Sequence, residues 1–377
     1  MEIWANIEKQ YDEKTKKHAG GKAREDLNLI FKEMGIKELE IVAPQQERSS
    51  ASKIQKLFYH YQIKKIWEHA VDQINSGDTW IIQFPVVNHT LLLREVIRKA
   101  KKRKIKIIAF VHDLEILRLS NADKISIFEK WRMKREELDE LYLFDYLVVH
   151  NKQMQKYINE QLNIPIEKIV VLQIFDYLIP GNYKHSKVKQ MQMKNCIIAG
   201  NLLHNKAEYV YKLPSLPDFE LYGINYDKYE NKDNIHYHGA FLADELPYYM
   251  QGGFGLVWDG NETKTCAGAW GKYLMYNNPH KVSLYLACGV PVIIWEKAAM
   301  AEFVISNKVG ITIKSLDELS EKIDEISYMQ YEKMERNAVQ ISQKLRTGYY
   351  TREVLKAIGI ENGNREYDEQ VENIIED

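Results

Sequence analysis

Residues 252–295 decide the fold, and they read GGFGLVWDGNETKTCAGAWGKYLMYNNPHKVSLYLACGVPVIIW. Two apolar runs in this stretch, Phe254–Trp258 and Pro291–Trp295, are typical of strands buried in a parallel sheet. Between them, Asn278 is expected to cap a helix and Pro279 to occupy its first turn, as both residue types commonly do. The stretch therefore predicts a strand, a loop, a helix and a second strand.

Polar residues gather where this helix is expected to begin, namely Asn278, His280, Lys281 and Ser283. A helix N-terminus presents unpaired N–H groups and the positive end of a dipole. Lys281 adds a full positive charge to them. We therefore expect these four residues to bind a phosphate or a diphosphate.

The run N-P-H-K-x-x-x-Y-L-A-C-G-V-P-V-I, which starts at Asn278, resembles the donor-binding segment of nucleotide-sugar glycosyltransferases with the GT-B fold. The preceding run, G-G-F-G-L-V-W, is similar to a smaller group among them. That group includes bacterial glucosyltransferases that extend GlcNAc on serine-rich adhesins, and galactofuranosyltransferase-like proteins. The resemblance covers about residues 78–352.

This resemblance implies an α/β protein of two Rossmann-like domains, whose parallel sheets face an interdomain cleft. It also implies transfer of a hexose (glucose, galactose or galactofuranose) from an NDP-sugar, with UDP as the expected nucleotide. The acceptor would be a hydroxyl of a glycan, a glycoprotein or a lipid-linked molecule in bacterial surface polysaccharide or glycoprotein synthesis. The donor is a substrate, and no cofactor is expected.

Length and composition agree with a two-domain globular protein. The chain has 377 residues, which exceeds the usual size of one domain. It is 45% hydrophobic and 28% charged, and its net charge of −1 gives no reason to expect nucleic acid as a partner. We expect instead a nucleotide-sugar donor, a glycosylated acceptor and a homo-oligomer.

The cysteines and the N-terminus indicate the compartment. Cys196, Cys266 and Cys288 lack the spacing of a zinc site or of a disulfide framework. The N-terminus lacks a basic region followed by an apolar one, and no run approaches 18 apolar residues. We expect a cytoplasmic protein that does not span the membrane.

Strand-like and helical segments alternate, which predicts βαβ units. In the first half, the expected strands are Glu2–Ile7, Leu39–Ala43, Trp80–Phe84, Ile105–Val111, Tyr146–His150 and Ile169–Ile174. The expected helices there are Ala23–Met34, Ser52–Asn75, Leu91–Arg103 and Asp123–Leu143. In the second half, a helix is expected at Asp244–Met250 besides the stretch quoted above.

Composition also suggests the domain boundaries. Residues 177–193 are rich in Lys, Gln, Pro and Gly without apolar periodicity, so we place the linker there. An N-terminal acceptor domain then covers residues 1–176, and a donor domain covers 194–345. Residues 346–377 are expected to cross back to the first domain and to end in an acidic tail.

Polar residues follow two strands of the first domain. Parallel sheets bind their ligands at these carboxyl ends of the strands. His89 follows the first, and His112, Asp113 and Glu115 follow the second. Transfer to a hydroxyl needs a base, for which Asp113 with His112 is the candidate. His89 and Glu115 are candidate acceptor contacts. The alternative is that Asp113 caps the next segment and His112 packs beneath it.

Glycine turns supply further candidates for the donor site. Gly20 and Gly21 precede a helix and let the backbone approach a ligand, although a plain turn is the alternative because the full G-x-G-x-x-G spacing is absent. Gly200 and Asn201 end a strand and resemble the loop that faces the donor in the relatives. Tyr222 either contacts the base or ribose, or is a core tyrosine.

A basic run lies on the helix before the Ile105–Val111 strand and at its exit. Such a run is usually a solvated face, and the alternative is peripheral contact with an anionic membrane. Its members are Arg94, Arg98, Lys99, Lys101, Lys102, Arg103, Lys104 and Lys106.

The sequence departs from many retaining GT-B families at two positions. Gly252 and Leu284 stand where those families carry glutamates, which leaves the stereochemical course open. Residues 259–277 form a longer segment, expected to be mobile over the donor. No Asp-x-Asp element follows a strand, so we expect no metal requirement. Two alternatives remain: an epimerase-like enzyme that consumes the nucleotide sugar, and a non-catalytic partner subunit.

Overall fold

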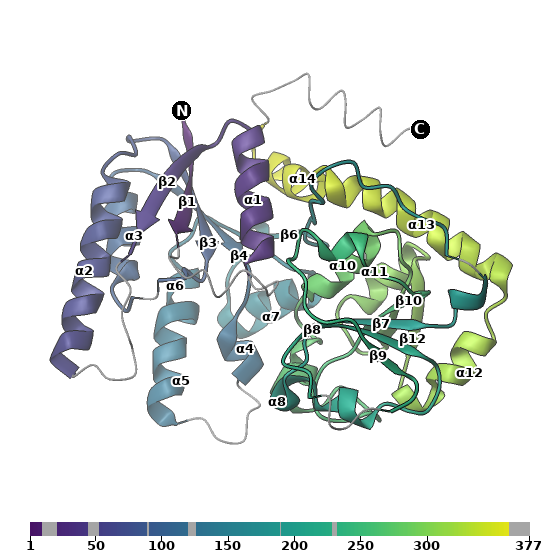
Figure 1. Ribbon diagram of the computed structural model, residues 1–377. Coiled ribbons are helices and arrows are strands. Elements are labelled where there is room, and N and C mark those ends of the chain that lie inside the picture. The colour runs from purple at the N-terminus through teal and green to yellow at the C-terminus, as the bar shows by residue number, and fades with distance from the viewer. Residues whose placement is uncertain are drawn as a thin grey trace.

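In the computed structural model the chain forms two α/β domains (Figure 1). The structure describes residues 1–9, 21–43, 53–88, 90–119, 126–188, 190–227 and 232–361. Each domain is built on a six-stranded sheet whose paired strands are all parallel. The predicted fold of two Rossmann-like α/β domains is therefore confirmed.

The N-terminal sheet has the strand order β2-β1-β3-β4-β5-β6. Its strands are β1 (Ile3–Lys9), β2 (Lys37–Val42), β3 (Thr79–Phe84), β4 (Lys106–Val111), β5 (Tyr146–Val149) and β6 (Ile169–Val171). The longer helices around it are α1 (Lys22–Glu33), α2 (Lys53–Val71), α3 (Leu93–Lys102) and α7 (Lys152–Leu162). All six residues of β3 are buried, as a central strand covered on both faces requires.

The segment after β4 differs from the prediction of one helix over Asp123–Leu143. It consists of α4 (Glu115–Leu119), α5 (Ile127–Met133), the π-helical turn η2 (Lys134–Leu138) and α6 (Asp139–Leu141). A capping box starts α5, where Ser126 and Glu129 exchange hydrogen bonds. The helix α7 was not predicted. Asn151 caps it through Gln153 N and Met154 N.

The C-terminal sheet has the strand order β12-β11-β10-β7-β8-β9. Its strands are β7 (Cys196–Asn201), β8 (Phe219–Ile224), β9 (Ile235–Tyr237), β10 (Phe254–Val257), β11 (Val292–Trp295) and β12 (Gly310–Ile313). Its helices are α8 (His204–Ala207), α9 (Gly268–Tyr273), α10 (His280–Ala287), α11 (Ala301–Ser306), α12 (Leu319–Asp324), α13 (Tyr328–Arg346) and α14 (Tyr349–Ala357). The helix expected at Asp244–Met250 is wrong, since only a 3-10 turn forms at Leu246–Tyr248.

The stretch at residues 252–295 folds as β10, α9, α10 and β11, so the two predicted strands and the predicted helix form, while the predicted loop contains the additional helix α9. A Cβ on Gly255 would lie 2.2 Å from the Tyr285 ring, so only glycine lets α10 pack directly on β10. The Tyr285 hydroxyl then accepts a hydrogen bond from Ala199 N at 2.8 Å. This contact joins α10 to β7, so the helix is fixed against two strands at once.

The C-terminal helix α14 lies beside α1 of the first domain (Figure 1). Arg352 forms an ion pair with Glu33 at 2.7 Å. The buried Asp176 carboxylate accepts hydrogen bonds from Tyr350 N and Thr351 N at the start of α14. After α13 the chain therefore contacts the N-terminal domain through α14. Residues 362–377, which contain the acidic tail, lie outside the described residues.

Candidate active site

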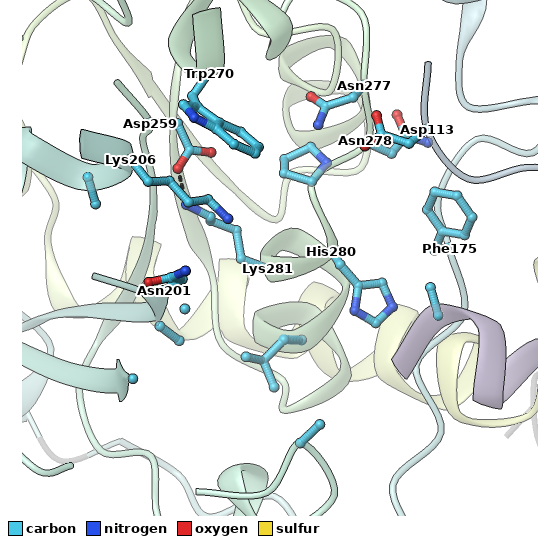
Figure 2. A pocket seen from close by; sticks show the side chains of 18 of the residues that line it. Asp113, Phe175, Asn201, Lys206, Asp259, Trp270, Asn277, Asn278, His280 and Lys281 are labelled. Carbon is cyan, nitrogen blue, oxygen red and sulfur yellow. Dashed lines mark hydrogen bonds and ion pairs between the residues drawn. The ribbon is translucent and has the colours of Figure 1, made fainter. Parts of the chain in front are cut away.

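A cavity of about 660 Å³ lies between the two domains and is lined by residues of both. Its volume falls within the range of roughly 300–1,000 Å³ that small-ligand sites occupy. Its wall includes the carboxyl ends of β4, β7, β8 and β10 and the start of α10, as expected for parallel sheets. Figure 2 shows the side chains that project into it from both domains.

Lys281 lies at this cavity, but its charge is already compensated. Its Nζ lies 2.9 Å from Asp259 Oδ1 and 3.0 Å from the carbonyl oxygen of Trp258 (Figure 2). A diphosphate bound here would share Lys281 with Asp259. The predicted phosphate contact thus needs a second cation to be strong.

That second cation is Lys206 on α8, which the sequence analysis missed. Its side chain lines the same cavity, and no described carboxylate lies within ion-pair distance of its Nζ. Its Nζ lies over the Trp270 ring, 4.7 Å from the ring centroid. Burial lowers the pKa of Lys206, and the charge of Asp259 opposes that effect. Its position a few residues after Gly200 was the signal that could have revealed it.

The start of α10 faces the cavity without a side-chain cap. Pro279 is the N-cap residue, so the prediction that Asn278 caps the helix is wrong. His280 lines the cavity, and neither of its ring nitrogens has a hydrogen-bond partner among the described residues. Burial lowers the pKa of His280 to about 4, so the ring is neutral at pH 7 and can donate or accept one hydrogen bond.

Asn278 connects the two domains. Its Nδ2 donates to the carbonyl oxygens of His150 at 2.7 Å and Gln173 at 2.9 Å, and its Oδ1 accepts from Asn151 Nδ2 at 2.7 Å. Its backbone N–H also donates to His150 Nδ1 at 2.9 Å. The amide lines the cavity, but these interdomain bonds occupy both of its ends.

Ser283 and Glu115 do not line the cavity. The Ser283 hydroxyl is buried and donates to the carbonyl oxygen of Phe175 at 2.7 Å. Glu115 forms ion pairs with Arg118 and Arg132 instead. Both side chains therefore support the structure around the cavity.

The glycine turn before α1 is only partly described. Gly21 is the N-cap residue of α1, while Gly20 and the acceptor candidate His89 lie outside the described residues. Arg24, one turn into α1, lines the cavity and was missed in the sequence. Its guanidinium donates to the carbonyl oxygens of Gln83 and Pro85, which holds its charge at the N-terminal wall.

His112 is held as a neutral ring. Its Nε2 lies 2.8 Å from Gln83 Oε1, and Gln83 donates its own amide N–H to Asn28 at 2.6 Å. This chain of bonds places the imidazole proton on Nε2. Burial and the charge of Arg24 lower the pKa of His112 well below its usual value. The ring also stacks on Phe175 with an interplanar angle of 11°.

Asp113 reaches the cavity with its side chain 40% exposed. Its Oδ1 accepts hydrogen bonds from the Tyr273 hydroxyl and from Leu114 N, and its Oδ2 lies 3.4 Å from Arg118. The N-terminus of α4 is capped by Glu137, which accepts from the N–H groups of residues 115 and 116. Asp113 is therefore not the cap of α4, although its contact with Arg118 still links it to that helix.

At the other end of the cavity, Gly200, Asn201 and Tyr222 line the wall. The Tyr222 hydroxyl accepts from Gln251 N at 3.0 Å and lies 3.3 Å from the carbonyl oxygen of Tyr249. Its ring is 2% exposed. The hydroxyl is thus occupied by backbone partners inside the protein, and a ligand can contact only the ring or the backbone of this residue.

The comparisons with known proteins agree with this geometry. The family description "Glucosyltransferase 3-like, N-terminal domain" matches residues 5–174, and "Glucosyltransferase 3-like, C-terminal domain" matches residues 196–358. The chain belongs to the glucosyltransferase 3-like family. It is a glycosyltransferase, and the predicted family and enzyme class are confirmed.

Individual relatives of this glycosyltransferase span most of its length. It is 38% identical to β-1,6-galactofuranosyltransferase WbbI of Escherichia coli over 288 residues, which is 76% of this chain and 80% of that protein. It is 24% identical to glucosyltransferase 3 of Streptococcus parasanguinis over 85% of this chain and 88% of that protein. These relatives support hexosyl transfer in bacterial glycan synthesis.

The fold is that of a solved sucrose-phosphate synthase from Thermosynechococcus elongatus. The TM-score is 0.60 at 11% identity, over 98% of this chain and all of that one. Among the residues that the structure describes, no cluster of three or more His, Cys, Asp or Glu side chains is placed to hold a metal ion. No described helix is long and apolar enough to cross a membrane.

Proposed function

We propose that this glycosyltransferase moves a hexose from a nucleoside-diphosphate sugar, with UDP as the nucleotide, to a hydroxyl of a glycan or glycosylated acceptor. The observation that carries this proposal is that a cluster of cations on the C-terminal wall and a carboxylate on the N-terminal wall, beside Arg24, line one cavity. Lys206, Lys281 and the uncapped start of α10 come from the C-terminal domain, whereas the Asp113 carboxylate comes from the N-terminal domain. Cations thus face a leaving diphosphate, and a base faces an incoming hydroxyl.

The diphosphate would bind between Lys206 and the start of α10. Charge builds on the leaving group as the glycosidic bond breaks, and fixed cations in a cavity with little water stabilise it. No described carboxylate forms an ion pair with Lys206, although the nearby charge of Asp259 favours its protonated form. Lys281 would exchange part of its contact with Asp259 for a phosphate oxygen, and neutral His280 would add one hydrogen bond.

The acceptor proton would pass to Asp113. His112 is the weaker candidate, because burial and the charge of Arg24 disfavour its protonated form. Asp113 lines the cavity, and its Oδ2 has one long contact, at 3.4 Å from Arg118 Nη1, so a lone pair remains for the acceptor proton. Two contacts hold its Oδ1, so the direction of the carboxylate is fixed.

The sugar that we propose is galactofuranose, with glucose and galactose as the other hexoses to test. The support is the 38% identity with a relative named β-1,6-galactofuranosyltransferase, against 24% with glucosyltransferase 3. We also propose that the reaction needs no metal ion, because the cations named above can carry the leaving-group charge. The protein would act in the cytoplasm as a homo-oligomer.

Peripheral membrane contact through the basic helix α3 has weak support. Lys99 pairs with Asp72 and Lys101 pairs with Asp145. Arg103 donates to the carbonyl oxygen of Val71. These bonds inside the domain leave less free charge for lipid headgroups than the sequence suggested.

The experiment that tests the function measures UDP release from UDP-glucose, UDP-galactose and UDP-galactofuranose, with and without alkyl glycosides as acceptors. Transfer predicts release that depends on the acceptor. Consumption of a nucleotide sugar without acceptor would support the epimerase-like alternative. UDP binding without consumption of any donor would support the non-catalytic subunit.

A further inference from the structure

The helix α9 belongs to the C-terminal domain by sequence but contacts α4 of the N-terminal domain. Its Tyr273 is 4% exposed and lies in the hydrophobic core of the N-terminal domain, among side chains such as Leu114 and Leu117. Its Trp270 ring faces cations of both domains. The ring centroid lies 4.4 Å from the guanidinium carbon of Arg118 and 4.7 Å from Lys206 Nζ. This segment is therefore docked across the cleft, and not a loop that hangs over it.

The Tyr273 hydroxyl forms a hydrogen bond with the candidate base, Asp113. Its oxygen accepts a hydrogen bond from Leu114 N at 3.0 Å, and its proton is donated to Asp113 Oδ1. Burial and the charge of Asp113 raise the pKa of Tyr273 well above its usual value, so the hydroxyl keeps its proton. Tyr273 can thus hold the carboxylate but cannot take a proton from the acceptor.

We propose that Tyr273 is a positioning residue, which orients the Asp113 carboxylate from the donor domain so that Oδ2 faces the acceptor. The inference rests on the proposed role of Asp113. It follows that the base is fully oriented only while α9 is docked on the N-terminal domain. The same helix carries Trp270, which contacts the donor-side cation Lys206. One short helix therefore touches both the donor side and the acceptor side of the reaction.

A purely structural role is the rival explanation, because the buried ring alone stabilises the interdomain contact. The substitution Tyr273→Phe separates the two roles. It keeps the ring in the core and removes only the hydroxyl, while Leu114 N retains Asp113 Oδ1 as its acceptor. Tyr276→Phe is the matched control. Tyr276 lies on the same segment and packs against the same core, but it does not line the cavity.

Tyr273→Phe removes the hydrogen bond that the hydroxyl donates to the charged Asp113 carboxylate. Because that bond touches only the proposed base, its loss should lower kcat and leave donor binding unchanged. For Tyr273→Phe we expect kcat to fall by about 10- to 100-fold, with the KM for UDP-galactofuranose and the Kd for UDP within about twofold of wild type. Tyr276→Phe should keep the wild-type kcat. An unchanged kcat in Tyr273→Phe, or an equal loss in both variants, would overturn the inference.

A double-mutant cycle excludes a general loss of stability. If Tyr273 acts through Asp113, Tyr273→Phe should slow the Asp113→Asn enzyme by no more than about twofold, whereas independent effects would multiply. If Asp113→Asn turns over slowly and Tyr273→Phe turns over normally, the positioning role of Tyr273 is overturned, while Asp113 remains the base. Normal turnover in Asp113→Asn shows instead that the proposed base is wrong, and the positioning role then falls with it.

Discussion

Substitution of Lys206 by alanine should weaken binding of the diphosphate more than any change outside the cavity. Lys206 is partly buried, and no described carboxylate pairs with it, so its charge is available to a ligand. A charge-assisted contact of this kind contributes about 1.5–3 kcal/mol. The Kd for UDP in Lys206→Ala should therefore rise by about 10- to 150-fold.

Isothermal titration calorimetry with UDP measures this directly. Lys212→Ala is the matched control, because Lys212 lies close in sequence but is exposed, pairs with Glu208 and does not line the cavity. We expect the control to bind UDP as the wild type does. Burial lowers the pKa of Lys206, so affinity for UDP should also fall as the pH rises toward alkaline values, and less so in Lys206→Ala. An unchanged Kd in Lys206→Ala would refute the placement of the diphosphate beside α8.

Three further predictions concern Lys281, the domain interface and the effect of pH. Lys281→Ala should also weaken UDP binding in calorimetry, partly because it leaves the Asp259 carboxylate unpaired beside the diphosphate. The double variant Lys281→Ala/Asp259→Ala removes that carboxylate and should therefore recover part of the lost affinity. Asn278→Ala removes three side-chain hydrogen bonds between the domains and should lower the free energy of unfolding by about 2–4 kcal/mol in a denaturant titration. Burial raises the pKa of Asp176 to about 7, so the folded state binds a proton more tightly than the unfolded state, and stability should fall as the pH rises from about 4 to about 7. Asp176→Asn should flatten that dependence in thermal unfolding, and an equally steep curve in the variant would count against it.

The strand–helix–strand unit around α10 was predictable because local pattern decides it. Buried apolar runs define β10 and β11, and Gly255 is required where α10 packs on the sheet. The strand ends that carry Asp113 and Gly200 followed from the same rule, since parallel sheets bind ligands at their carboxyl ends. The resemblance then gave the reaction class.

The remaining site residues depend on contacts that no local pattern contains. Asn278 has the residue type of a helix cap, but it bonds across the interface to residues more than one hundred positions earlier. Glu137 caps α4 from a π-helical turn that follows it, so Asp113 does not serve as that cap. Tyr273 sits in the core of the other domain. Lys206 became a candidate only when the structure showed that Lys281 is already paired.

The proposed mechanism requires that one cavity joins a diphosphate-binding wall to a base on the opposite domain. Its most direct test is the rate of acceptor-dependent UDP release from UDP-galactofuranose by wild type and Asp113→Asn. Asn keeps the shape of the carboxylate but cannot take the proton. We expect kcat to fall by about 10²- to 10⁴-fold with the Kd for UDP unchanged. Near-normal turnover in the folded Asp113→Asn variant would show that Asp113 is not the base.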